Sequence, residues 1–103
     1  MEKEKKYTFD GELRFEGEYL NGKRNGKGKE YNYDGKLIFE GEYLKGERNG
    51  KGKEYYNNEE LEFEGEYLQG KKWNGIGYNK NDNIEYEIQD GKGNFKNIII
   101  MIN

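Results

Sequence analysis

The chain has 103 residues, 18 basic and 21 acidic side chains and a net charge of −3. Its length therefore fits one domain, and it has no excess of positive charge for nucleic acid. It contains no Ser, Cys or His and a single Thr, so the usual acyl-transfer nucleophiles, the triad base and the common transition-metal ligands are missing. Aromatic residues make up 16% of the chain, enough to line a core although aliphatic residues are scarce. We expect a folded, non-catalytic protein with no cofactor, no metal and no nucleic-acid partner.

The N-terminal segment Met1–Lys6 is charged and has no apolar run. It does not match a secretory signal, which needs an apolar stretch of about 7–15 residues. We expect residues 1–6 to form a frayed N-terminus. We also expect a cytoplasmic protein, either fully soluble or held peripherally at a membrane.

From residue 7 onward the sequence repeats with an offset of 24 positions. The segment Phe15–Leu20 returns as Phe39–Leu44 and again as Phe63–Leu68. Such repeats indicate units that bury their apolar faces against one another. The pattern predicts units over residues 7–30, 31–54, 55–78 and 79–95, of which the last is degenerate. In the third unit the alignment adds one residue around Trp73, before the segment Asn74–Tyr78.

Each unit begins with a strand pattern. Over residues 12–20 the odd positions are Leu13, Phe15, Gly17 and Tyr19, whereas the even positions from 12 to 18 are charged. Strict alternation is typical of a half-buried antiparallel strand. A glycine inside such a strand indicates a close approach, so we expect a ring from a neighbouring strand to lie over Gly17.

Turn dipeptides separate the strands: Asn21-Gly22, Asn25-Gly26 and Asp34-Gly35. The sequence therefore predicts an all-β protein in which tandem β-hairpins form an elongated, twisted, single-layer antiparallel sheet.

Basic residues gather in the loop and second strand of each unit, and acidic residues in the first strand. If the units stack in register, the bases form a stripe along one edge, and acidic rows line the face opposite the rings. Two interpretations are open: a binding site for an anionic ligand such as lipid headgroups, or cross-strand Glu–Lys pairing with protection of the sheet edge. The pattern favours pairing. The candidate anion-binding residues are Lys23, Arg24, Lys27, Lys45, Arg48, Lys51, Lys71 and Lys72.

Other candidate motifs are weak. The pair Glu16 and Glu18 could serve glycoside hydrolysis, but it recurs identically in the next two units, which favours a solvated strand face. The segment Gly17–Lys23 fits the start of a P-loop but is followed by Arg24, and no helix is expected there. The segment Asn79–Asn83 lacks the glycine and final glutamate of an EF-hand loop, so we expect a turn.

Two features fall outside the repeat. Trp73 either plugs the end of the ring ladder or is an exposed anchor for a partner, and packing is favoured. The apolar run at residues 98–102 lies within a C-terminal segment, 96–103, that either covers the last strand edge or pairs with a second chain. The candidate partner contacts are therefore Trp73, Ile98, Ile100 and Ile102.

The units resemble MORN repeats, whose pattern is an aromatic residue, a glycine and a second aromatic residue, followed by a glycine and a Gly-x-Gly segment. Phe and Tyr stand where Tyr and Trp are usual, and the period is one residue longer. These departures are similar to bacterial repeats in antitoxin-like proteins. The matching residues are Phe15, Gly17, Tyr19, Gly22, Gly26, Gly28, Phe39, Gly41, Tyr43, Gly46, Gly50, Gly52, Phe63, Gly65, Tyr67, Gly70, Gly75 and Gly77.

The resemblance implies an elongated, twisted sheet of stacked hairpins with an aromatic-lined groove. It also implies a scaffold, a dimerisation module or a membrane-associated adaptor. Three hypotheses follow: a protein-interaction or scaffolding module with a protein partner, including a homodimer through a sheet edge or the C-terminal run; a peripheral binder of anionic phospholipid; and an antitoxin or immunity-type inhibitor of a toxin.

Overall fold

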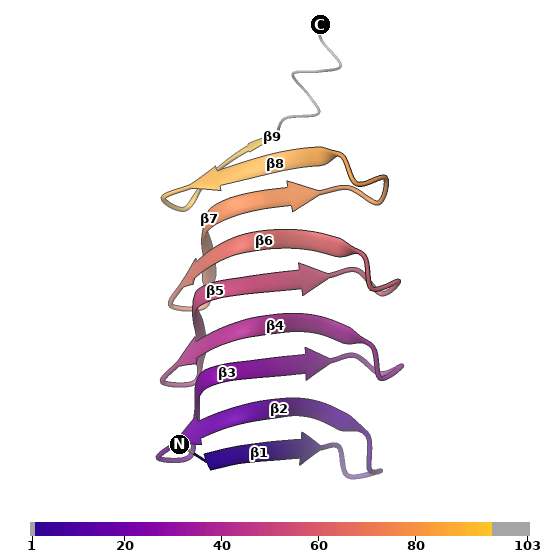
Figure 1. Ribbon diagram of the computed structural model, residues 1–103, viewed down its shortest axis with the longest axis vertical. Helices are drawn as coiled ribbons and strands as arrows, with labels where there is room; N and C mark the ends of the chain where they lie inside the picture. Colours follow the sequence, from indigo (N-terminus) through magenta and orange to yellow (C-terminus); the bar gives the residue numbers. More distant parts are fainter. Residues whose placement is uncertain (1, 96–103) are drawn as a thin grey trace, which may run out of the picture.

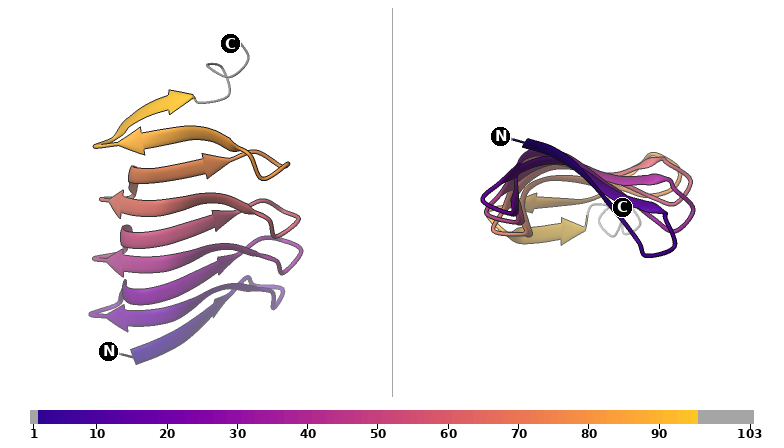
Figure 2. Two further views of the ribbon diagram at one scale, coloured as in Figure 1. Left: turned by 45° about the horizontal axis from the view of Figure 1, so that its top comes forward. Right: turned by 90° about the horizontal axis from the view of Figure 1, so that it is seen from below.

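The computed structural model describes residues 2–95, which form nine strands in one open antiparallel sheet. Each strand pairs with the strands before and after it in sequence (Figure 1). The predicted all-β hairpin meander is confirmed. The sheet measures about 50 × 29 × 15 Å and twists along its length as a single curved layer (Figure 2). The strands are β1 (Glu2–Tyr7), β2 (Leu13–Leu20), β3 (Lys23–Tyr31), β4 (Leu37–Leu44), β5 (Glu47–Tyr55), β6 (Leu61–Leu68), β7 (Lys71–Tyr78), β8 (Ile84–Gln89) and β9 (Lys92–Phe95).

Two-residue turns connect the strands at one side of the sheet, where β2, β4, β6 and β8 end. In the turn after β2, Asn21 has φ 52° and Gly22 has φ 79°. Positive φ at both positions defines a type I′ turn, which matches the twist of the flanking strands. The turns Lys45-Gly46, Gln69-Gly70 and Asp90-Gly91 have the same signs.

Longer loops connect the strands at the opposite side, where β1, β3, β5 and β7 end. In the loop from Asn32 to Lys36, the Asn32 side-chain oxygen accepts hydrogen bonds from the backbone nitrogens of Asp34 (2.9 Å) and Lys36 (3.0 Å). The loop from Asn79 to Asn83 repeats this geometry, so the predicted turn there is present. Asn side chains stabilise such loops because they supply a second acceptor beside the backbone.

The core is a ladder of aromatic rings on one face of the sheet. Phe39 is fully buried and makes edge-to-face contacts with Tyr43 (5.7 Å between centroids) and Tyr67 (5.3 Å). The Phe15 ring contacts Tyr19 and Tyr43 in the same way. Edge-to-face pairs at these distances contribute about 0.5–1.5 kcal/mol beyond the burial of their area. The rings therefore join neighbouring hairpins into one continuous core.

Strand glycines make room for these rings, but not quite as expected. A Cβ on Gly28 would lie 2.5 Å from Phe15 of β2 and 2.9 Å from Tyr43 of β4. A Cβ on Gly17 would instead lie 2.6 Å from the Lys27 carbonyl oxygen and 2.6 Å from the Gly28 Cα. The rings of neighbouring strands thus cover Gly28, whereas Gly17 lets the adjacent backbone approach.

The first residues form an edge strand, and the expectation of a frayed segment at 1–6 is wrong for Glu2–Lys6. Strand β1 pairs with β2 from Glu2 opposite Tyr19 to Tyr7 opposite Leu13. The alternating charges of β1 fit an exposed sheet edge, because charged side chains discourage further strand pairing. Residues 96–103, with Ile98, Ile100 and Ile102, lie outside the described residues.

The dipeptide Asn25-Gly26 is not a turn but lies within a bulge of β3. Gly17 is opposite Gly28 and Tyr19 is opposite Arg24, so Glu18 alone faces three residues. The carboxylate of Glu18 accepts a hydrogen bond from the Lys27 backbone nitrogen (2.8 Å), and Gly26 has φ 97°. A bulge needs such a conformation, which glycine adopts at low cost.

The third unit is one residue shorter at this bulge, not one residue longer. Gly65 is opposite Gly75 and Tyr67 is opposite Lys72, so only two residues fill the place of three. Gly75 therefore corresponds to Gly28 of the first unit. Gly77 lies opposite Phe63, where earlier units have a glutamate, and a Cβ there would meet the Tyr86 ring at 2.1 Å.

Candidate functional site

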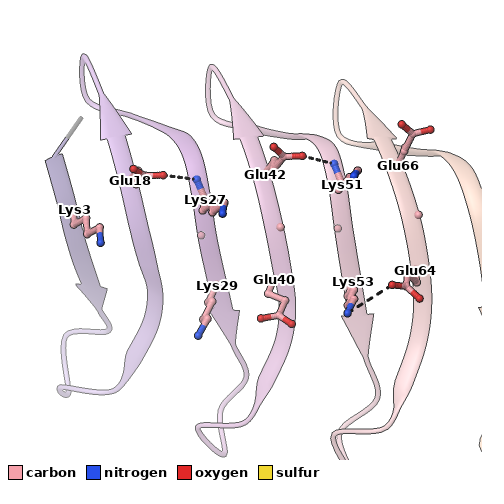
Figure 3. A pocket seen from close by; sticks show the side chains of 14 residues that line it. Lys3, Glu18, Lys27, Lys29, Glu40, Glu42, Lys51, Lys53, Glu64 and Glu66 are labelled. Atoms are coloured by element: carbon pink, nitrogen blue, oxygen red, sulfur yellow. Dashed lines mark hydrogen bonds and ion pairs between the residues drawn. The ribbon is translucent and has the colours of Figure 1, made fainter.

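The face opposite the rings carries an open groove of about 980 Å³ (Figure 3). We call it the charged groove. Strand alternation puts these side chains on the solvent face, because their neighbours point into the ring ladder. The resemblance implied an aromatic-lined groove, which is wrong here: the six core rings are at most 9% exposed. The lining residues are Lys3, Glu18, Lys27, Gly28, Lys29, Glu40, Gly41, Glu42, Lys51, Gly52, Lys53, Glu64, Gly65 and Glu66.

A line of glycine backbones forms the floor of the groove. Gly28 is opposite Gly41, Gly41 opposite Gly52, and Gly52 opposite Gly65. These positions would direct a side chain toward the ring ladder, where a Cβ on Gly52 would lie 2.8 Å from Phe39. The packing of the rings on one face thus explains the glycines beneath the groove on the other.

Two rows of alternating charge border this floor. The row nearer the two-residue turns, called the turn-side row, reads Lys-Glu-Lys-Glu-Lys-Glu from β1 to β6. The row nearer the longer loops, called the loop-side row, has the same order. Figure 3 shows both rows from β3 to β6. The turn-side row is Lys3, Glu18, Lys27, Glu42, Lys51 and Glu66, and the loop-side row is Lys5, Glu16, Lys29, Glu40, Lys53 and Glu64.

Several of the carboxylates are held in place. Glu42 accepts a hydrogen bond from the Lys51 backbone nitrogen (2.7 Å), as Glu18 does from Lys27. The Tyr55 hydroxyl donates to Glu40 (2.6 Å), and the Tyr31 hydroxyl donates to Glu16 of the same loop-side row (2.5 Å). Burial, together with this hydrogen bond and the negative charge, raises the pKa of Tyr31 to about 12. The acceptors therefore stand at fixed points along both rows.

Within the described part of the chain, most of the ammonium groups of the two rows have no such partner. Among residues 2–95, the ion pair between Lys53 and Glu64 (3.6 Å) is the one formed within the two rows. Lys27 and Lys51 reach no carboxylate within 4.0 Å in that part of the chain. Cross-strand register brings opposite charges side by side, as the favoured interpretation expected, but leaves most of these lysines able to meet an outside anion.

The predicted basic stripe along one edge is not formed. The eight candidate cations separate into three places. Two lie in the charged groove (Lys27 and Lys51), three lie at the two-residue turns (Lys23, Lys45 and Lys71), and three lie over the ring ladder (Arg24, Arg48 and Lys72).

The cations over the rings are tied to half-buried carboxylates. The Arg48 guanidinium lies 3.9 Å from the Phe39 ring centroid and pairs with Glu30 (3.1 Å) and Glu54 (2.7 Å). Burial alone would raise the pKa of Glu30, but hydrogen bonds from Arg48 and Tyr43 and the nearby positive charge lower it. These cations therefore stabilise the ring face and are poorly placed to capture a separate anion.

Trp73 lies beside the turn between β8 and β9. Its backbone oxygen accepts a hydrogen bond from the Gly91 nitrogen (2.8 Å), and a Cβ on Gly91 would lie 2.9 Å from the Trp73 ring. The residue remains 37% exposed. Tyr86, and not Trp73, stacks on Phe63 at the end of the ring ladder. Trp73 packs against the turn and keeps an open face, and its contact with a partner stays a prediction.

An apolar column next to the groove was not anticipated. Leu20, Leu44 and Leu68 are 49%, 48% and 41% exposed. They end β2, β4 and β6 and by alternation share the face of the charged groove, just outside the turn-side row. The sequence did carry a signal for this column. The three leucines recur every 24 residues and occupy even positions, as the glutamates of the same strands do.

Within residues 2–95, no group of His, Cys, Asp or Glu side chains is arranged to hold a metal ion. Over the same residues, no helix is long and apolar enough to cross a membrane.

An open sheet of stacked hairpins, with a ring ladder on one face and a repeated charge pattern on the other, defines a tandem β-hairpin repeat protein. The family model for the MORN repeat matches residues 15–36 and 39–59. The chain therefore contains two adjacent MORN repeats. No curated protein matches the sequence. The MORN match supports a repeat module of a kind that generally binds partners or membranes and is generally non-catalytic.

Proposed function

We propose that this chain is a non-catalytic protein-interaction module and that the charged groove is its binding surface. The alternating charge of the groove supports this proposal most directly. Its lining contains five lysines and five glutamates, so the surface has no net charge. A membrane of anionic headgroups favours a surface with excess positive charge, whereas another protein can match a pattern of alternating signs.

The preorganised carboxylates add support. Glu18 and Glu42 are fixed by backbone hydrogen bonds, and Glu40 is fixed by a tyrosine hydroxyl. A partner that meets fixed groups loses less of its binding free energy to ordering side chains. The exposed leucine column supplies apolar area beside the charges, and stable interfaces commonly combine the two.

Catalysis is not supported by the residues in the groove. The lysine and glutamate pairs recur from unit to unit, whereas an active site needs one distinct arrangement. An antitoxin or immunity-type inhibitor would be one form of the proposed protein-binding function. Binding to anionic phospholipid, the remaining alternative, would need cations that the structure distributes over three places.

The test compares two variants with the wild-type chain in capture from a lysate of the source cells, followed by cross-linking and mass spectrometry. The groove variant combines Lys27→Gln, Glu42→Gln, Lys51→Gln and Glu66→Gln, so its net charge is unchanged. The control combines Lys36→Gln, Glu59→Gln, Glu60→Gln and Lys92→Gln at exposed turn and edge positions.

We expect the wild type and the control to retain the same proteins and the groove variant to lose them. Equal retention by all three chains would show that the groove is not the binding surface. The wild-type chain could instead capture no protein, not even a second copy of itself, and float with phosphatidylserine vesicles. That result would replace this proposal with the membrane function.

A further inference from the structure

We infer that the partner of the charged groove is a second copy of this chain, bound face to face with the two long axes antiparallel. The two-fold axis runs parallel to the strands and passes between β3 and β4. This inference rests on the proposed function and names its partner. The order of charges in the two rows carries it.

Each row is complementary to its own reverse. Read from β1 to β6, the signs run plus, minus, plus, minus, plus, minus; read from β6 to β1, they run in the opposite order. The proposed two-fold axis places β1 against β6, β2 against β5 and β3 against β4 of the second copy. Every lysine then faces a glutamate. In the turn-side row, Lys3 faces Glu66, Lys51 faces Glu18, and Lys27 faces Glu42.

The loop-side row follows the same rule. Lys5 faces Glu64, Lys53 faces Glu16, and Lys29 faces Glu40 of the second copy. By symmetry, each contact is made twice. An interface of this type is isologous, because the same patch serves both subunits.

Other stackings of the same face bring like charges together. A two-fold axis along the length of the sheet would put the turn-side row on the loop-side row, so that Lys27 would face Lys29. A slip by one strand in the proposed arrangement would also put lysine on lysine. Strands are about 4.8 Å apart, so a slip of that size reverses every contact. The charge pattern therefore selects the orientation and excludes a slip by one strand, and a slip by two strands keeps lysine–glutamate contacts on only four of the six strands of each copy.

The apolar column fits this arrangement. Leu20, Leu44 and Leu68 lie on alternate strands. In the proposed dimer Leu20 faces β5 of the second copy, where Glu47 lies between Leu44 and Leu68, and Leu44 faces Lys23 of β3. The stems of these charged side chains, with the leucines beside them, cover Leu20 and Leu44, which are 49% and 48% exposed in the single chain.

The single chain also leaves the required groups available. Lys27 and Lys51 form no ion pair among residues 2–95, while the carboxylates of Glu18 and Glu42 are already oriented. The size is adequate as well. A stable interface buries about 800 Å² per partner, and roughly half of a face about 50 Å long and 29 Å wide supplies that area.

The test uses the purified chain in sedimentation equilibrium at low and high salt. We expect twice the monomer mass at about 100 µM in low salt. We also expect a shift toward monomer in about 0.5 M salt, because exposed ion pairs are screened. A monomer under all conditions overturns the inference. The proposed function stands without this inference if the purified chain is monomeric and the groove variant of the previous section fails to retain another protein that the wild type captures.

A charge swap between the ends of the array tests the register. Positions 3 and 66 lie on β1 and β6, five strand spacings or about 24 Å apart in one chain, and meet only in the proposed dimer. Lys3→Glu and Glu66→Lys should each weaken dimerisation about tenfold, because each creates two like-charge contacts. The double variant should return to within about threefold of wild type. An equal mixture of the two single variants should form a heterodimer.

The matched control is Lys36→Glu, an exposed turn residue outside the groove, which should leave the dimer dissociation constant unchanged. Thermal unfolding of each variant confirms that its fold is intact. If the affinity losses of the two single variants add in the double variant, or if neither substitution changes dimerisation, the contact lies on another surface and the inference is overturned.

Discussion

Gly52 shows why single residues decide the packing of this sheet. A Cβ at this position would lie 2.8 Å from Phe39 of β4 and 2.9 Å from Tyr67 of β6. Both rings are almost fully buried, so neither can move without disturbing its neighbours. The glycine is therefore required by packing on the ring face and not by backbone conformation, because its φ lies outside the left-handed region.

We predict that Gly52→Ala lowers the free energy of unfolding by about 2 kcal/mol, the usual cost of overpacking a core. Urea unfolding followed by circular dichroism measures this change. The control is Gly93→Ala, where the nearest atom to the new Cβ is 3.9 Å away and a change within about 0.5 kcal/mol is expected. Equal costs for the two substitutions would contradict the role assigned to Gly52.

Pairs of strands are joined by more than their backbone hydrogen bonds. Arg48 on β5 reaches back to Glu30 on β3 and along its own strand to Glu54. Tyr43 on β4 donates to Glu30 from the other side. Arg24 occupies the equivalent place one unit earlier but approaches Glu30 only to 4.0 Å. The strength of the tie between hairpins therefore differs along the array.

We predict that Arg48→Met costs about 2 kcal/mol of stability, because it removes the guanidinium that two half-buried carboxylates share. Arg24→Met should cost less than half of that, and thermal unfolding at pH 7 compares them. The pKa of Glu30 is held below its usual 4.5, so this pairing contributes fully above that pH and is lost as the pH falls through the lowered value. The difference between wild type and Arg48→Met should therefore shrink in acid. A constant difference would argue against this ion pair.

Over the part of the chain that the structure describes, residues 2–95, the molecule is a linear array, since each strand pairs only with its sequence neighbours. Stability in such arrays is approximately a sum over units and the interfaces between them. The register repeats closely between the first two units: Phe15 faces Glu30, as Phe39 faces Glu54. One unit can therefore be removed while every remaining interface keeps its geometry.

We predict that deleting residues 31–54, which joins Glu30 to Tyr55, leaves a folded sheet of lower stability. The dependence of the unfolding free energy on urea should fall by about a quarter, because it scales with the area exposed on unfolding. Circular dichroism and a urea titration test both points. An unfolded product would mean that the array behaves as one indivisible unit.

The sequence by itself determined the hairpin array and its ring face. Alternation in Leu13, Phe15, Gly17 and Tyr19 specified a strand and its buried side, because the side-chain period of a strand is two. The repeat offset then carried that assignment along the chain. The turn at Asn21-Gly22 also followed from composition, since those residues adopt positive φ at low cost.

Tertiary structure alone decided the register. Asn25-Gly26 has the composition of a turn, but Glu18 opposite it holds a bulge, so the strand continues. The charged β1 has little intrinsic strand pattern and pairs because β2 presents a free edge. Trp73 lies in a bulge that is one residue shorter than that of the first unit. Matching the Gly-x-Gly segments alone had aligned this unit as one residue longer. Register fixes which lysine lies beside which glutamate, so the charged groove and its alternating rows depend on contacts between strands that no local pattern contains.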